Sequence, residues 1–154
     1  MELKILSQKI AEDMSKILDK KTSIISIVCP GENDAVFFDN KNIDKILRLY
    51  FNDCISDIKM QNTVLKAPTQ DDFKGLKNFV DNLSCDLLIV HCGAGVSRSA
   101  AVAAAINDYL NLDYNIFENP NYSPNPTVYK CCQNELGIAK TKDFYKNLFS
   151  GDER

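Results

Sequence analysis

The segment "CDLLIVHCGAGVSRSAAVAAAINDYLN" (residues 85–111) limits the possible folds more than any other part of the chain. Its first part is nearly all apolar, which is typical of a strand at the centre of a sheet that is covered on both faces. Its last part is rich in alanine, which favours a helix that can lie close to a sheet. A short turn with two glycines joins the two parts. The segment therefore predicts a strand–turn–helix unit of an α/β fold.

The rest of the chain continues this alternation. Apolar and β-branched runs predict strands at residues 3–6, 22–30, 35–38 and 44–51. Apolar residues at helical spacing predict helices at residues 7–20, 69–83, 123–136 and 141–149. No repeat, low-complexity tract or linker divides the sequence, so we expect a single domain over residues 1–154. The predicted fold is α/β, with a central, mainly parallel sheet of four to five strands flanked by helices.

Local patterns give three further predictions. The buried face of the first helix is expected to consist of Ile10, Met14, Ile17 and Leu18. Thr69 and Asp72 have the spacing of a capping box at the start of the second predicted helix. Residues 52–68 show no period and are expected to form an extended loop. A loop of this length in a compact domain is more often functional than idle.

The charge of the chain excludes several classes of partner. The formal net charge is −3 and the isoelectric point is about 5.1, so no basic field favours nucleic acid or an anionic membrane. The first ten residues lack the apolar segment that export needs, and no apolar run is long enough to span a bilayer. We therefore expect a cytoplasmic protein whose six cysteines are reduced thiols. With a single histidine in the chain, no metal site and no cofactor are expected.

The turn between the predicted strand and helix carries residues suited to anion chemistry. Ligands of open α/β sheets bind beyond the carboxyl ends of strands, and a helix N-terminus offers unpaired N–H groups to an anion. Gly93 and Gly95 allow the backbone to curl so that successive amides point inward. Arg98 supplies a planar fork that matches two phosphate oxygens. In the same cradle Cys92 is expected to have a lowered thiol pKa. The turn can therefore hold a phosphate and attack it.

The stretch "HCGAGVSRS" resembles the H-C-x5-R-S/T signature of cysteine-dependent protein tyrosine and dual-specificity phosphatases. The order of elements also resembles the fold of that family, and "LRLYFND" and "YSPNPTVY" look like segments of its compact bacterial branch. The resemblance implies a phosphatase-type fold and a phosphocysteine intermediate on Cys92. It implies that Ser99 assists departure of the cysteine sulfur and that His91 hydrogen-bonds to the loop backbone. The phosphate would be bound by Gly93, Ala94, Gly95, Val96, Ser97 and Arg98.

The same resemblance implies an aspartic acid that protonates the leaving group, on a loop some thirty to forty residues before the cysteine. Asp53 and Asp57 lie 39 and 35 positions upstream of Cys92 (92 − 53 and 92 − 57). Asp53 is favoured because it follows directly from a predicted strand. Asp57 stays open as the alternative, since geometry must decide which of them reaches the substrate. Asp71 and Asp72 are interpreted as residues of a helix start.

Three other functions compete with a phosphatase. A dinucleotide-binding loop is disfavoured because Arg98 occupies the place of the third glycine in "GAGVSR". A rhodanese-like sulfurtransferase would not need Asp53, and an inactive phosphate-binding module would need neither Asp53 nor Cys92. The expected partner is a phosphorylated protein, preferably a phosphotyrosine one, or a small phosphomonoester. Asn125 is expected to cap a helix, and Cys131 and Cys132 are expected to pack in the core rather than to form a redox pair with Cys92.

Overall fold

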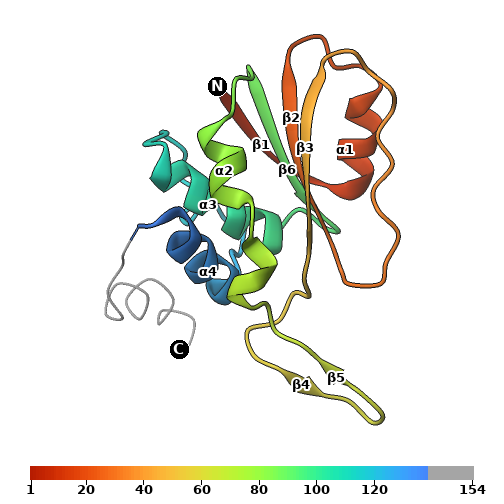
Figure 1. Ribbon diagram of the computed structural model, residues 1–154, viewed down its shortest axis with the longest axis vertical. Helices are drawn as coiled ribbons and strands as arrows, with labels where there is room; N and C mark the ends of the chain where they lie inside the picture. Colours follow the sequence, from red (N-terminus) through yellow and green to blue (C-terminus); the bar gives the residue numbers. More distant parts are fainter. Residues whose placement is uncertain (139–154) are drawn as a thin grey trace.

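The computed structural model describes residues 1–138 of the chain (Figure 1). The helix expected at residues 141–149 lies outside the described residues. No helix within the described part of the chain is both long enough and apolar enough to cross a bilayer.

A four-stranded parallel sheet forms the centre of the fold. Its strands are β1 (Glu2–Ser7), β2 (Thr22–Val28), β3 (Ile43–Tyr50) and β6 (Leu87–Cys92). They are arranged in the order β1-β6-β2-β3, and every pair is parallel. The two inner strands, β6 and β2, are buried along their whole length, and the first four residues of β6 and four of the seven residues of β2 are apolar. The predicted α/β class with a central parallel sheet of four to five strands is confirmed.

Helices cover both faces of the sheet. Helix α1 (Gln8–Ser15) lies on one face, and α2 (Leu76–Asp81), α3 (Arg98–Tyr109) and α4 (Pro126–Leu136) lie on the other (Figure 1). The larger core lies between the sheet and the second group of helices, and the alanine-rich α3 packs there against β6. The smaller core lies under α1 and contains Ala11, Leu18 and Ile24. Because helices cover both faces, a ligand would bind at the end of the sheet where the strands have their carboxyl termini.

The first helix differs from its prediction in length and in its buried face. Helix α1 ends at Ser15 rather than near residue 20, and it packs through the small residues Ala11 and Ser15. Ile10 and Ile17 are 51% and 76% exposed, so the expected apolar face is wrong at these two positions. The helix stops early because the side-chain amide of Asn40 donates hydrogen bonds to the carbonyls of Ser15 and Leu18. A side chain from a distant loop thus ends the helix.

Residues 35–38 do not form the predicted strand. The N–H of Val36 donates to the Glu12 carboxylate at 2.7 Å, and the N–H of Phe38 donates to the Ser15 hydroxyl at 2.7 Å. The segment therefore bonds to side chains of α1 rather than to a neighbouring strand.

Residues 52–68 contain a hairpin that the sequence pattern does not reveal. Strands β4 (Ile58–Lys59) and β5 (Val64–Leu65) pair antiparallel, and the hairpin projects from the body of the molecule near the carboxyl ends of the main strands (Figure 1). The helix predicted at residues 69–83 is divided into a 3-10 turn, η1 (Gln70–Phe73), and α2. Gly75, with φ of +87°, separates the two pieces. The predicted capping box is present, because the N–H of Thr69 donates to the Asp72 carboxylate at 2.8 Å.

Candidate functional site

The loop between β6 and α3 is held against the first strand by a glycine. Cys92 is the last residue of β6 and Arg98 the first of α3, so residues 93–97 form the turn. Gly95 has φ of +72°, which favours glycine. A Cβ at this position would lie 2.5 Å from the carbonyl carbon of Leu6 and 2.6 Å from the nitrogen of Ser7. The loop therefore depends on glycine for its backbone conformation and for its approach to β1.

The loop carbonyls are directed outward by hydrogen bonds from neighbouring segments. Gly93 accepts from the N–H of Gln8, and Val96 accepts from the N–H of Ser123. Ser97 accepts from the N–H of Asn125. In a trans peptide the carbonyl and the next N–H point in opposite directions. The N–H groups that follow these three carbonyls therefore point away from the neighbouring segments, as an anion cradle requires.

Cys92 lies at the base of this cradle and is 2% exposed. Its Sγ atom accepts a hydrogen bond from the Gly95 N–H at 3.3 Å and lies 3.1 Å from the Ser99 hydroxyl. Burial on its own raises the pKa of the Cys92 thiol. The hydrogen bonds from the Ser99 hydroxyl and backbone and from the Gly95 N–H, together with the charge of Arg98, outweigh burial and lower that pKa below its ordinary value. The sulfur is therefore a thiolate over a wider pH range than an ordinary cysteine.

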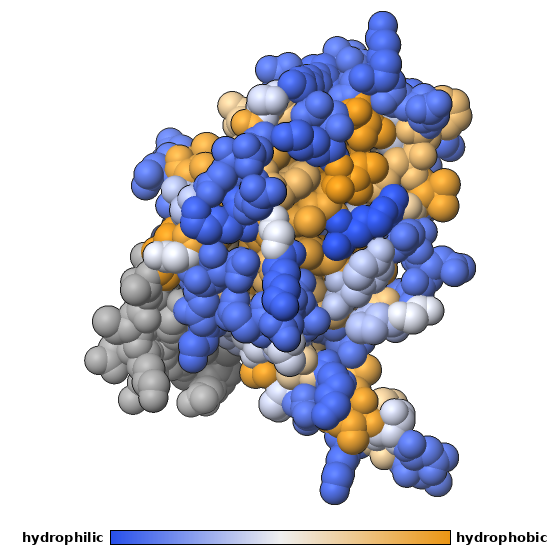
Figure 2. Space-filling model, viewed as in Figure 1, coloured by the Kyte–Doolittle hydropathy of each residue, from blue (hydrophilic) through white to orange (hydrophobic). Residues whose placement is uncertain are grey.

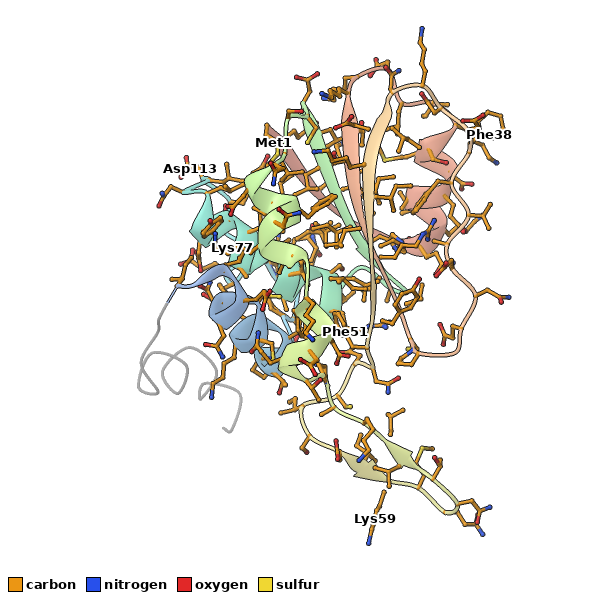
Figure 3. The ribbon with its side chains drawn as sticks, in the orientation of Figure 1. Met1, Phe38, Phe51, Lys59, Lys77 and Asp113 are labelled. Carbon is orange, nitrogen blue, oxygen red and sulfur yellow. The ribbon has the colours of Figure 1, made fainter. Side chains whose placement is uncertain are left out.

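Arg98 points from the start of α3 toward the ends of β2 and β3. Its Nη1 donates to the Cys29 sulfur at 3.3 Å and to the Phe51 carbonyl at 3.2 Å. Phe51 lies between the sheet and the projecting hairpin that carries Lys59 (Figure 3). The Nε atom of Arg98 is buried, with no hydrogen-bond partner among the described residues. Gly93 leaves room for the guanidinium, since a Cβ there would lie 3.4 Å from Nη2. An oxyanion in the loop would satisfy the unpaired donor.

His91 is fully buried beneath the loop and supports its backbone. Its Nδ1 atom lies 3.2 Å from the Cys92 carbonyl oxygen, and its Nε2 lies 2.6 Å from the Ser26 hydroxyl. A carbonyl only accepts, so Nδ1 carries the proton and Nε2 accepts from Ser26. Burial lowers the pKa of His91 below its ordinary value, which favours this neutral form. The structure thus brings His91 to the loop backbone, as the resemblance implied.

The two candidate acids have different surroundings. Asp53 is exposed at the loop, where its Oδ1 accepts from the Ser97 hydroxyl at 2.8 Å and from the Asn125 side-chain amide at 2.9 Å. Asp57 instead belongs to the base of the hairpin. Its carboxylate accepts from the N–H of Ala67 at 2.8 Å and from Lys66 at 3.4 Å, and these two donors lower its pKa. Only Asp53 contacts the loop that holds Cys92.

Several residues of the site have no signal in the sequence pattern. Asn125 caps α4 as predicted, by accepting from the N–H groups of Thr127 and Val128, but its amide also holds Asp53. Ser26 lies in β2 and Cys29 directly after it, and nothing in their spacing links them to the loop.

Cys131 and Cys132 lie on α4, where Cys132 is completely buried, and burial raises the pKa of both thiols.

A cavity of about 700 Å³ opens beside the loop. Asp53 and Ser97 form its wall on the side of the loop, and Ile55 and Ile58 form its wall on the side of the hairpin. Further walls come from the segment that leads into α4, including Pro124 and Asn125. The arrangement brings together a buried thiol of lowered pKa, inward-facing amides, a guanidinium and an exposed carboxylate beside open space. These groups can bind an oxyanion, attack it and supply or remove a proton.

Comparison with known proteins gives little further information. No protein-family model matches the chain, and no curated protein matches it. Among solved structures the chain is similar to a human tyrosine phosphatase-like serine/threonine/tyrosine-interacting protein. The similarity covers 76% of this chain and 77% of that one, with 23% sequence identity and a TM-score of 0.49.

Proposed function

We propose that the protein is a metal-independent phosphomonoester hydrolase that acts through a phosphocysteine intermediate, as protein tyrosine and dual-specificity phosphatases do. The observation that carries the proposal is the environment of the Cys92 sulfur. It accepts a hydrogen bond from the Gly95 N–H and lies next to the Ser99 hydroxyl, in a loop whose helix begins with Arg98. A structural cysteine in an apolar core has the opposite environment, as Cys132 shows by its raised pKa.

The reaction proceeds in two displacements at phosphorus. The Cys92 thiolate attacks the phosphoryl group while Arg98 and the loop N–H groups bind its oxygens, and the bond from phosphorus to the leaving oxygen breaks. That oxygen takes a proton from Asp53. A water molecule then attacks the phosphorus of the phosphocysteine and passes one of its protons to the Asp53 carboxylate. The sulfur–phosphorus bond breaks, and the electron pair returns to Cys92, whose thiolate is stabilised by the hydrogen bond from Ser99.

Asp53 suits the role of acid and base better than Asp57. The hydrogen bonds from Ser97 and Asn125 hold one of its oxygens beside the loop, and it lines the cavity. The lowered pKa of Asp57 means that this carboxyl carries the proton that a general acid must donate over a narrower pH range. The cavity has room for an aromatic ring beside the loop, which supports a phosphotyrosine substrate. A cytoplasmic location, in which thiols stay reduced, suits an enzyme whose nucleophile is a thiolate.

Hydrolysis of a chromogenic aryl phosphate in the presence of a chelator tests the proposal. The native protein is expected to release phosphate, and Cys92→Ser is expected to release none while still binding vanadate. Cys85→Ser is the matched control, because it makes the same change outside the site. Equal activity in the native protein and Cys92→Ser would contradict a phosphocysteine mechanism. Phosphate binding without turnover in the native protein would identify an inactive phosphate-binding module.

A further inference from the structure

The projecting hairpin has an exposed apolar face. Ile58 pairs with Leu65, and the N–H of Met60 bonds to the carbonyl of Thr63. Cross-strand partners share a face and alternate residues share a face, so Ile58, Met60 and Leu65 lie on the same side. Ile58 and Met60 are 47% and 55% exposed. Figure 2 shows apolar surface along the hairpin and hydrophilic surface at its tip. We call Ile58, Met60 and Leu65 the arm face.

The arm face is continuous with the candidate phosphate site. Ile58 lines the cavity beside the loop, together with Ile55 before it in the chain. The lining of the same cavity also includes Asp53 and Ser97. A molecule whose phosphate is bound in the loop and that fills this cavity therefore contacts Ile58, and Met60 and Leu65 adjoin Ile58 on the hairpin.

Hydrogen bonds hold the base of the hairpin in place beside the site. The Lys66 carbonyl accepts from the Asn52 amide at 3.1 Å and from the Cys54 thiol at 3.4 Å, which closes the two ends of the hairpin. The Thr127 hydroxyl donates to the Ile55 carbonyl at 2.7 Å and so attaches the base to α4. The arm face is therefore held beside the segment that carries Asp53 rather than on a free tail.

We propose that the arm face binds the polypeptide that flanks a phosphorylated residue, and that the substrate is a phosphoprotein with apolar residues next to the modified side chain. The inference rests on the proposed function for the position of the phosphate. The arm face begins at Ile58 on the cavity wall and continues along the strand to Met60, about 7 Å further at ~3.3 Å per residue. A small phosphomonoester held in the loop does not extend that far, but several residues of an extended polypeptide do.

A membrane is a less suitable occupant of the same face. Insertion into lipid favours an apolar tip with basic flanks, whereas the tip of this hairpin consists of Gln61 and Asn62. Lys66 pairs with Asp57, and the chain as a whole carries a charge of −3. An anionic lipid surface is therefore not attracted to the molecule as a whole, while an extended apolar peptide needs no such attraction.

The test is a binding measurement on Cys92→Ser protein, which separates the inference from catalysis. Two fluorescent phosphotyrosine peptides are compared, one with leucine and valine around the phosphotyrosine and one with serine and glycine there. We expect the apolar peptide to bind about tenfold more tightly, because apolar side chains are buried on the arm face. Adding Met60→Gln, which keeps the length of the side chain, is expected to remove most of this preference. Adding Val64→Thr is the matched control, since Val64 lies on the opposite side of the hairpin.

Three results would overturn the inference while leaving the proposed function intact. The first is equal affinity for the two peptides, and the second is equal loss of the preference with Met60→Gln and Val64→Thr. The third is sedimentation with phosphoinositide vesicles that Met60→Gln abolishes, without any preference between the peptides. Conversely, a preference for the apolar peptide that depends on Met60 supports the arm face even if the native protein hydrolyses no aryl phosphate. The two proposals can therefore fail separately.

Discussion

Replacing Gly95 by alanine tests the close approach of the loop to β1. The new Cβ would lie 2.5 Å, 2.6 Å and 2.8 Å from backbone atoms of Leu6 and Ser7, and backbone cannot move aside as a flexible side chain can. Overpacking of this kind costs about 1–3 kcal/mol. A residue with a Cβ at positive φ costs a further ~1–2 kcal/mol. We expect Gly95→Ala to lower the free energy of unfolding by about 2–5 kcal/mol in total.

Gly31 provides the matched control. Its φ of +84° is similar to that of Gly95, but a Cβ there would meet no atom within 4 Å. Gly31→Ala therefore carries the conformational cost alone, about 1–2 kcal/mol. The difference between the two variants isolates the clash with β1.

Urea denaturation of the native protein and both variants gives the three free energies of unfolding. Differential scanning calorimetry with and without inorganic phosphate adds a functional readout, because a ligand that binds the folded state raises the melting temperature. Phosphate is expected to stabilise Gly31→Ala as it does the native protein and to stabilise Gly95→Ala less. If both variants lose the same stability, the loop does not depend on contact with β1 and the reasoning is wrong.

Three other predictions concern the charged and titrating groups of the site. Asp53→Ala is expected to lower kcat on an aryl phosphate by about 10²–10⁴-fold and to retain vanadate binding. Asp57→Ala is expected to keep most of the activity. The reverse pattern would assign the acid to Asp57. The rate at which iodoacetamide alkylates Cys92 is expected to have its midpoint at a lower pH than for an ordinary thiol, and inorganic phosphate should slow the reaction. A midpoint at the usual thiol value would refute activation by the loop. Above the ordinary histidine pKa of about 6.5, His91 is neutral in both the folded and the unfolded chain. As the pH falls through that value, the unfolded chain takes up a proton at His91 that the folded chain does not, because burial lowers the pKa of His91 in the folded state. The free energy of unfolding therefore decreases as the pH falls. This part of the pH dependence of unfolding should be absent in His91→Asn. An NMR titration of the chain's one histidine should give a midpoint below 6.5. A midpoint above that value would contradict burial as the dominant cause of the pKa shift of His91.

The parts of the fold that sequence analysis predicted correctly depend on contacts between residues that are close together in the sequence. The run from Leu87 to Tyr109 encodes a buried strand, a turn and a helix within one segment, so its pattern is readable without the rest of the chain. The contacts of Cys92 with Gly95 and Ser99 span three and seven residues, and their spacing is visible in the sequence. These short sequence separations explain why the group formed by Cys92, Gly95 and Ser99 could be predicted from the sequence.

The parts that were missed depend on contacts between distant residues. Arg98 reaches Cys29 across 69 residues and His91 reaches Ser26 across 65, and no spacing rule connects such pairs. Ile10 and Ile17 were wrongly placed on the buried face of the first helix because large apolar residues were assumed to be inside. In the structure the small side chains of Ala11 and Ser15 allow close packing instead. The hairpin escaped detection because its strands are two residues each, too short to show alternation.

The bridge from Asn125 to Asp53 has a consequence for the order in which the site is completed during synthesis. The contacts of the Cys92 sulfur and the approach of Gly95 to β1 involve residues before position 110, whereas the Val96 and Ser97 carbonyls accept hydrogen bonds from Ser123 and Asn125. The bridge joins residues 72 positions apart in the sequence and cannot form until the start of α4 has left the ribosome. A nascent chain would therefore have Cys92 and its hydrogen-bond partners in place before the loop carbonyls and Asp53, the proposed general acid, are held in position. If the proposed reaction takes place, turnover therefore requires that the start of α4 has folded against the loop.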